Sequence, residues 1–269
     1  MKTRPIILSI AGSDSGGGAG IQADIKTISA VGGYACTAIT AVTAQNTLGV
    51  RAVYPVPDEA LRQQLAAVGD DLAVAAVKIG MLPTAGQVEV VASAIARYGW
   101  RQVVLDPVLV ATSGDVLVQG AAAGRMADRL FGLCTLLTPN IAEAAALTGL
   151  AVADEAGMQA AAETLLGRGS RAVLVKGGHL AGERMTDWLY RSDAAGNVVR
   201  RAFSAAKVHT VHLHGTGCTL SSAIAAYLGM GYDLEAAVEA AKAYIGRAIA
   251  AAQPLGHGRG PVNHFADWE

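Results

Sequence analysis

The segment His214-Gly215-Thr216-Gly217-Cys218 has the composition of an anion-binding site. Its two glycines leave the backbone free to turn N–H groups inward, and the small-residue run 219–228 is predicted to be a helix whose N-terminus adds donors and a positive dipole end. Fixed positive potential there would favour a thiolate at Cys218, which could take a proton from a hydroxyl that attacks a phosphate. The alternative is an ordinary helix start with a buried structural cysteine.

Four other polar residues that suit phosphoryl transfer follow predicted strands: Asp106, Asn140, Glu143 and Lys176. Asn140 and Glu143 are three residues apart, so on a helix they would share a face and could point together at water bound to a divalent ion. The same pair is equally typical of a helix cap. Lys176 could reach a nucleotide phosphate, although a lysine at a strand end is often simply solvated.

Residues 12–20, Gly-Ser-Asp-Ser-Gly-Gly-Gly-Ala-Gly, form a glycine-rich loop after a predicted strand. The loop fails the dinucleotide fingerprint, which requires glycine or alanine where Ile21 stands, and the Walker pattern, which requires glycine in place of Ile25. We therefore favour a loop that lets backbone approach a flat substrate over a mere chain reversal.

Three histidines, His209, His212 and His214, lie within six residues. On an extended strand two of them would share a face and could bind a transition metal. Because no cysteine or carboxylate stands at a supporting spacing, we interpret them as strand histidines exposed to solvent.

The elements that must position these residues alternate between short β-branched runs and longer alanine-rich stretches. The predicted strands are 6–11, 35–42, 74–79, 102–105, 134–137 and 172–176, and the predicted helices are 20–31, 58–68, 84–98, 141–147, 155–166, 219–228 and 234–252. This order predicts one doubly wound α/β domain over residues 1–269, with a mostly parallel sheet and helices on both faces. A hairpin around 193–197 predicts an antiparallel edge.

Composition narrows the class of protein. Apolar residues make up 52% of the 269 residues and charged residues 16%. The charged fraction is below the ~25% typical of soluble domains, which indicates that much of the chain is buried in a compact, enzyme-like domain. We expect this domain to form a homodimer. The net charge of −1 with scattered Lys and Arg argues against binding to nucleic acid or an anionic membrane. No apolar run reaches the ~18 residues of a membrane span and no leader is evident, so we expect a cytoplasmic protein.

The three cysteines are odd in number and widely spaced, which fits neither a disulfide framework nor a C-x-x-C site. Cys36 and Cys134 lie in apolar runs and are predicted to be core residues.

Eight motifs occur in an order that resembles the bacterial hydroxymethylpyrimidine/phosphomethylpyrimidine kinases of thiamine biosynthesis, which belong to the ribokinase superfamily. They are Ile10-Ala11-Gly12-Ser13-Asp14, Gly17-Gly18-Ala19-Gly20-Ile21-Gln22-Ala23-Asp24, Thr43-Ala44-Gln45-Asn46-Thr47, Lys78-Ile79-Gly80-Met81-Leu82, Asp106-Pro107-Val108, Thr138-Pro139-Asn140-x-x-Glu143, Lys176-Gly177-Gly178-His179 and His214-Gly215-Thr216-Gly217-Cys218. The resemblance extends over essentially the whole chain, to Gly258-x-Gly260-Pro261-Val262-x-His264-Phe265.

The resemblance implies a ribokinase-like three-layer α/β/α fold and an ATP- and Mg²⁺-dependent kinase. Its substrates would be the 5-hydroxymethyl group of 4-amino-5-hydroxymethyl-2-methylpyrimidine and then the resulting monophosphate. Two alternatives stay open: a pyridoxal kinase of the same superfamily, and a non-catalytic pyrimidine-binding protein.

The resemblance also implies residue roles. Cys218 would be the catalytic base, with the N–H groups of Gly215, Thr216, Gly217 and Cys218 stabilising charge on the transferring phosphoryl group. For the substrate pocket it implies Gln45, whose amide can both donate and accept along the ring edge, together with Gly12, Asp24, Met81 and Val108.

For the nucleotide, the resemblance implies Asp106 and Lys176 along the triphosphate. Asn140 and Glu143 match the motif that orders Mg²⁺, with Glu143 acting through water.

The chain departs from the family pattern in three places. Ser15 and Gly16 replace the usual Pro-Ser pair, which predicts a more flexible loop. Thr112 stands where a lysine is frequent, and Val211-His212-Leu213 replaces Lys-Asn-Thr, so a positive charge and a polar contact near the nucleotide would be missing. These changes bear on rate and nucleotide affinity more than on the type of reaction.

Overall fold

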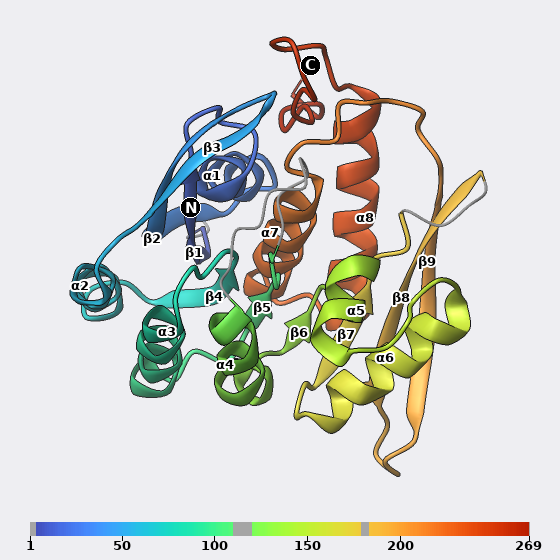
Figure 1. Ribbon diagram of the computed structural model, residues 1–269, viewed down its shortest axis with the longest axis horizontal. Helices are drawn as coiled ribbons and strands as arrows, with labels where there is room; N and C mark the ends of the chain where they lie inside the picture. The colour runs from blue at the N-terminus through green and yellow to red at the C-terminus, as the bar shows by residue number, and fades with distance from the viewer. Residues whose placement is uncertain (1–3, 110–119, 179–182, 269) are drawn as a thin grey trace.

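The computed structural model describes residues 4–109, 120–178 and 183–268. A nine-stranded sheet runs through the centre of these residues (Figure 1). Its strands, in spatial order, are β3 (Gly49–Pro55), β2 (Tyr34–Asn46), β1 (Ile6–Asp14), β4 (Val74–Ile79), β5 (Val103–Leu105), β6 (Leu136–Leu137), β7 (Ala172–Val175), β8 (Arg184–Ser192) and β9 (Val198–Ala206).

The six strands from β2 to β7 are parallel, which confirms the predicted doubly wound sheet. At one edge β8 and β9 form the predicted antiparallel hairpin. At the other edge β3 pairs antiparallel with β2, an arrangement that the sequence analysis did not predict. The side chains of β3 are all partly or fully exposed, so this strand lacks the apolar run that marks a buried one.

Helices cover both faces of the sheet (Figure 1). One layer contains α1 (Gly20–Ala30), α7 (Thr216–Gly229) and α8 (Leu234–Ala250), and the other contains α2 (Asp58–Gly69), α3 (Ala85–Tyr98), α4 (Gly120–Leu130), α5 (Ile141–Thr148) and α6 (Glu155–Gly167). This is the predicted α/β/α fold. Among the described residues, no helix combines the length and apolar character needed to cross a membrane.

Two helix positions differ from the prediction. Helix α4 was missed, since it begins with glycine and carries a second glycine at position 124, which lowers helix propensity. Helix α7 begins at Thr216, three residues earlier than predicted.

The core is divided by the sheet. Ile7 of β1 packs in the cluster with α7 and α8, whereas Leu8 and Ile10 pack in the cluster with the opposite helix layer, and all three are fully buried. Burial on both faces fixes the parallel strands in place, so their carboxyl ends form one rigid edge where side chains from distant segments meet.

Candidate active site

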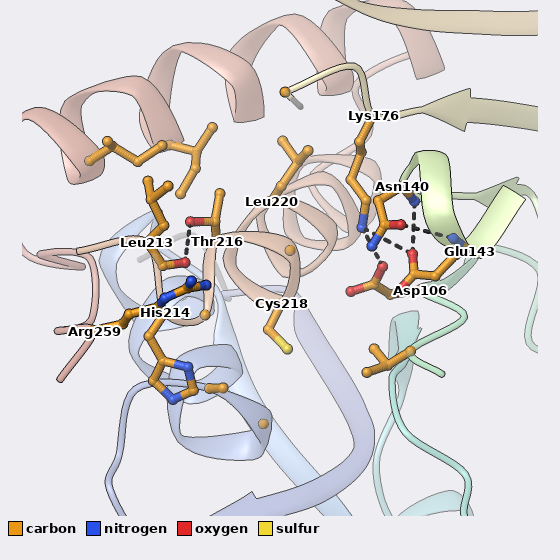
Figure 2. A pocket seen from close by; sticks show the side chains of 18 of the residues that line it. Asp106, Asn140, Glu143, Lys176, Leu213, His214, Thr216, Cys218, Leu220 and Arg259 are labelled. Atoms are coloured by element: carbon orange, nitrogen blue, oxygen red, sulfur yellow. Dashed lines mark hydrogen bonds and ion pairs between the residues drawn. The ribbon is translucent and has the colours of Figure 1, made fainter. Parts of the chain in front are cut away.

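A cavity of about 880 Å³ opens at the carboxyl ends of the parallel strands. All but one of the residues predicted for the site line it: Gly12, Gln45, Met81, Asp106, Val108, Asn140, Glu143, Lys176, Gly215, Thr216, Gly217 and Cys218. In Figure 2, Cys218 lies between His214 on one side and the Asp106, Lys176 and Glu143 group on the other. The cavity therefore has two ends, with the cysteine between them.

The start of α7 is shaped by Gly215. This residue is the N-cap in the left-handed conformation, with φ of 82°. Thr216 N donates to the carbonyl oxygen of Leu213 (3.2 Å) and Thr219 N donates to that of Gly215 (2.9 Å). The amides between them, those of Gly217 and Cys218, belong to the first helical turn, where N–H groups lack intrahelical acceptors and the helix dipole is positive. This geometry suits a phosphate.

We expect Gly215→Ala to disrupt this start. A Cβ at position 215 would overlap the carbonyl oxygen of Gly18, and the backbone conformation disfavours L side chains. The cost should be about 1–3 kcal/mol in the free energy of unfolding, accompanied by a large loss of turnover; urea unfolding and kcat measure the two effects. The control is Gly124→Ala in α4, where the added Cβ meets nothing within 4 Å and helix stability should rise by roughly 0.5–1 kcal/mol. A stable, fully active Gly215→Ala protein would contradict the argument.

The thiol of Cys218 differs from the prediction of a thiolate. Burial raises its pKa to about 11, and the carboxylates of Asp24 and Asp106 raise it further, while Lys78 and the amide of Gly20 lower it. Desolvation therefore outweighs the positive potential of the helix end, and the cysteine is a protonated thiol in the ligand-free protein.

At the other end of the cavity, Asp106 fixes Lys176. The Lys176 ammonium donates to Asp106 Oδ1 (2.8 Å), which also accepts from Thr138 Oγ1 (3.1 Å). Asp106 Oδ2 accepts from Ser221 Oγ (3.3 Å) on α7. Asp106 is 1% exposed, and its partners hold its pKa below the ordinary value despite burial. The site thus presents a positioned cation beside an ionised carboxylate.

Asn140 and Glu143 form a capping box at the start of α5. Asn140 Oδ1 accepts from the Glu143 amide (2.9 Å), and Glu143 Oε2 accepts from the Asn140 amide (2.8 Å). The helix-cap interpretation is therefore realised, and both residues also line the cavity. Burial raises the pKa of Glu143 to about 7, against the opposing effect of Lys176, 3.9 Å away.

This raised pKa predicts a pH-dependent stability. Below pH 4.5, Glu143 is protonated in both the folded and the unfolded chain, so it does not affect the free energy of unfolding. As pH rises from about 4.5 towards 7, Glu143 loses its proton in the unfolded chain but keeps it in the folded chain. The free energy of unfolding therefore falls over this range. We expect Glu143→Gln, which keeps the cap, to be close to wild type at about pH 4.5 and more stable by on the order of 2 kcal/mol at about pH 8. Urea unfolding at both pH values measures this difference. A constant difference across pH would show that Glu143 does not titrate in this range.

The donor set at this end fits a hydrated magnesium ion. In the part of the chain that the structure describes, no three His, Cys, Asp or Glu side chains converge to hold a metal. Mg²⁺, however, is commonly held by one or two carboxylates together with water and substrate phosphates. The carboxylates of Asp106 and Glu143 at the cavity wall meet that requirement.

The end of the cavity next to His214 is built on Asp14 and Gln45. Asp14 accepts from the amides of Gly16 (2.7 Å), Gly18 (3.0 Å) and Ala19 (2.8 Å). Ser15 Oγ donates to the Gln45 carbonyl (2.7 Å) and accepts from the Gln45 amide (2.9 Å). These bonds tie the glycine-rich loop to the end of β2, contrary to the flexibility expected from the Ser15–Gly16 departure.

Gly12 and Met81 shape the same end of the cavity. The terminal methyl of Met81 lies so close to Gly12 that a Cβ there would overlap it. Glycine at this position therefore lets the Met81 side chain pack across the pocket, where a flat ring could contact it.

The three histidines have separate partners. His214 Nε2 lies 2.9 Å from Asp14 Oδ2, and His212 Nδ1 accepts from the Gly260 amide (3.1 Å). His209 lies 3.3 Å from Glu183. Residues 207–213 are not a strand, so the predicted strand face is absent here, and the described residues contain no metal cluster. Leu213 and Val211 line the cavity, whereas Thr112 lies outside the described residues.

Asp24 is the predicted site residue that does not line the cavity. It is 0% exposed, and its carboxylate accepts from Lys78 Nζ (2.9 and 3.0 Å), Ser9 Oγ (2.5 Å) and Ser222 Oγ (2.6 Å). Substrate contact was therefore the wrong expectation for Asp24 in this conformation. The sequence analysis assigned no role to Lys78, although a lysine inside the apolar strand 74–79 is a detectable signal, because a buried charge needs a partner.

Comparisons with known proteins identify relatives that match nearly the whole chain. The family model described as phosphomethylpyrimidine kinase matches residues 14–263. The hydroxymethylpyrimidine/phosphomethylpyrimidine kinase of Rhizobium meliloti (strain 1021) is 53% identical over 266 residues, covering 98% of each chain.

Two solved structures share the fold. The ADP complex of Bacillus subtilis pyridoxal kinase superposes with a TM-score of 0.89 at 34% identity and covers 99% of both chains. The phosphomethylpyrimidine kinase of Clostridium difficile 630 superposes with a TM-score of 0.80 at 39% identity, covering 91% of this chain and all of that one.

Proposed function

Because the chain belongs to the phosphomethylpyrimidine kinase family, we propose that it transfers the γ-phosphoryl group of ATP to the 5-hydroxymethyl group of 4-amino-5-hydroxymethyl-2-methylpyrimidine, and then a second one to the monophosphate. One observation carries the proposal: Gln45, Met81, Lys176 and Cys218 line a single cavity of about 880 Å³. Since both steps consume ATP, we place the reaction in the cytoplasm.

At the substrate end, the Gln45 amide would donate and accept hydrogen bonds along the aminopyrimidine edge, and Met81 would pack on the ring face. Val108 and Gly12 would complete the walls. This pose directs the hydroxymethyl group towards Cys218. The base is the thiolate form of Cys218, so the thiol must lose its proton to solvent before transfer. As the hydroxyl oxygen bonds to the γ-phosphorus and ADP leaves, this thiolate takes the hydroxyl proton.

At the phosphate end, the amides of Gly217 and Cys218 and the Lys176 ammonium would stabilise charge on the transferring group. Asp106 holds Lys176 in place (2.8 Å). Asn140 orients Glu143, which would hold magnesium through water. When bound, the ion would neutralise phosphate charge. The ADP complex of the 34% identical B. subtilis kinase supports nucleotide binding in this fold.

A coupled assay of ADP release with three acceptors tests the substrate. We expect turnover on the hydroxymethylpyrimidine and on its monophosphate, with kcat/KM for both well above that for pyridoxal. Dominant turnover of pyridoxal would overturn the choice of substrate. Binding of the pyrimidine by calorimetry without ADP release would instead establish a non-catalytic binding protein.

The outer face of the β2–β3 edge supports the expected homodimer. Val42 and Tyr54 are cross-strand partners, and their side chains are 50% and 64% exposed. A second copy of the chain would cover this apolar pair. In sedimentation velocity we expect a dimer for the wild type and a monomer for Tyr54→Glu; a wild-type monomer at micromolar concentration would refute this assembly.

A further inference from the structure

A fully buried ion pair lies beneath the cavity floor and has no place in the mechanism above. Lys78 on β4 and Asp24 on α1 are both 0% exposed, and the ammonium donates to both carboxylate oxygens, at 2.9 and 3.0 Å. Burying such a pair is expensive, and apolar residues of similar volume often serve stability as well or better. Its presence beside a reactive site therefore points to a task other than folding.

Two observations place this pair in the neighbourhood of Cys218. Ser222 donates to Asp24 Oδ1 (2.6 Å), and it follows Cys218 by four residues on α7, so the two residues lie on the same helix face. Lys78 and Cys218 also line the same cavity, whereas Asp24 does not. The ammonium is thus held by Asp24, outside the cavity lining, while Lys78 itself lines the cavity that also contains Cys218.

We propose that Lys78, held by Asp24, is a positioning residue that supplies a fixed positive charge beneath Cys218 and stabilises its thiolate. The inference rests on the proposed role of Cys218 as the base. During transfer, the Cys218 thiolate gains the hydroxyl proton, the new O–P bond forms, and the bond between the γ-phosphorus and the ADP oxygen breaks. Lys78 keeps its proton throughout and acts only through its charge.

The charges that face Cys218 agree with this assignment. Among the charged groups, Lys78 lowers the pKa of the Cys218 thiol most strongly. Burial and the carboxylates of Asp24 and Asp106 raise it. Lys176, directly after β7, also interacts electrostatically with Cys218. The two members of the buried pair therefore act on the pKa of Cys218 in opposite directions, so removing one charge at a time is expected to shift the thiolate fraction in opposite directions.

The test is the rate at which iodoacetamide alkylates Cys218 between about pH 7 and pH 10, followed by mass spectrometry of the peptide that contains it. The rate reports the thiolate fraction. Compared with wild type, we expect alkylation to be about tenfold slower in Lys78→Met and about tenfold faster in Asp24→Asn, since a nearby charge shifts a pKa by about one unit or more. The double variant Asp24→Asn/Lys78→Met should be alkylated at Cys218 more slowly than Asp24→Asn.

Cys36 is the internal reference. It is partly exposed, and burial raises its pKa to about 11 as well. It packs with the Leu8 cluster, on the face of the sheet opposite α1, which carries Asp24. Its alkylation should not change among the variants. If Lys78→Met does not fold, the comparison of Asp24→Asn with the neutral double variant still measures the charge of Lys78.

The outcomes separate the two proposals. Equal alkylation of Cys218 in all variants, or shifts in the same direction for both single variants, overturns the role of Lys78. Ordered alkylation rates support it. Turnover of Cys218→Ala bears only on the base itself, because alkylation of the wild-type thiol does not depend on catalysis.

Discussion

Cys218→Ala is expected to lower kcat for the hydroxymethylpyrimidine by about 10²–10⁴-fold, because the variant lacks the group that takes the hydroxyl proton. The amide of residue 218 and the start of α7 remain, so KM for the pyrimidine and for ATP should change little. A loss confined to kcat and kcat/KM is the signature of an interaction made in the transition state. Steady-state kinetics with both acceptors measures the effect.

The matched control is Cys36→Ala, which removes a partly buried thiol from β2 outside the cavity. It should retain wild-type turnover. The Cys218 thiol has a pKa of about 11 in the ligand-free protein, so the wild-type rate should also rise with pH through the neutral range. Wild-type turnover in Cys218→Ala would remove the cysteine from the mechanism and leave substrate positioning as the function of the motif.

Lys176→Met is expected to lower kcat by about 10²–10³-fold and to raise KM for ATP. Lys176 provides a positioned cation at the phosphate end, and losing one such donor typically costs two to three orders of magnitude in kcat, about 3–4 kcal/mol. The variant also leaves the carboxylates of Asp106 and Glu143 without a cation that lies 2.8 and 3.9 Å away. The pKa of Glu143 should therefore rise further, since Lys176 lowers it in the wild type.

Two further variants serve as controls for Lys176→Met. Lys176→Arg keeps the charge and should recover part of the activity. Lys207→Met removes a lysine that does not line the cavity and should behave as wild type. Thermal unfolding shows whether Lys176→Met is folded at the assay temperature. A folded Lys176→Met protein with unchanged kcat and KM for ATP would exclude Lys176 from phosphate stabilisation.

Local patterns predicted most of the fold. The strands around Ile7, Lys78 and Val173 and the helices that follow them have strong periodicity and are long enough to be recognised. The exceptions, β3 and α4, are elements whose local signals are weak. In β3 the side chains are at least partly exposed, and α4 contains glycine. Their positions depend on partners elsewhere in the chain, namely β2 for the strand and α3 for the helix.

The order of the elements and the chemistry of single residues were enough to predict which polar groups meet at the cavity. Asp106, Asn140 and Lys176 each follow a parallel strand, and the carboxyl ends of parallel strands share one edge, so topology alone brings them to the same cavity. The glycines before Cys218 similarly predicted an amide-rich helix start. These inferences need only the order of elements and the chemistry of single residues.

Protonation states and ion pairs, in contrast, follow from packing in three dimensions. Asp24 became the counter-ion of Lys78 instead of a substrate contact, and Cys218 became a thiol of high pKa instead of a thiolate. Both results depend on desolvation and on neighbours far away in the sequence, such as Ser222 beside Asp24. Burial and long-range partners determine the free energy of a charge, and neither can be read from local residue order.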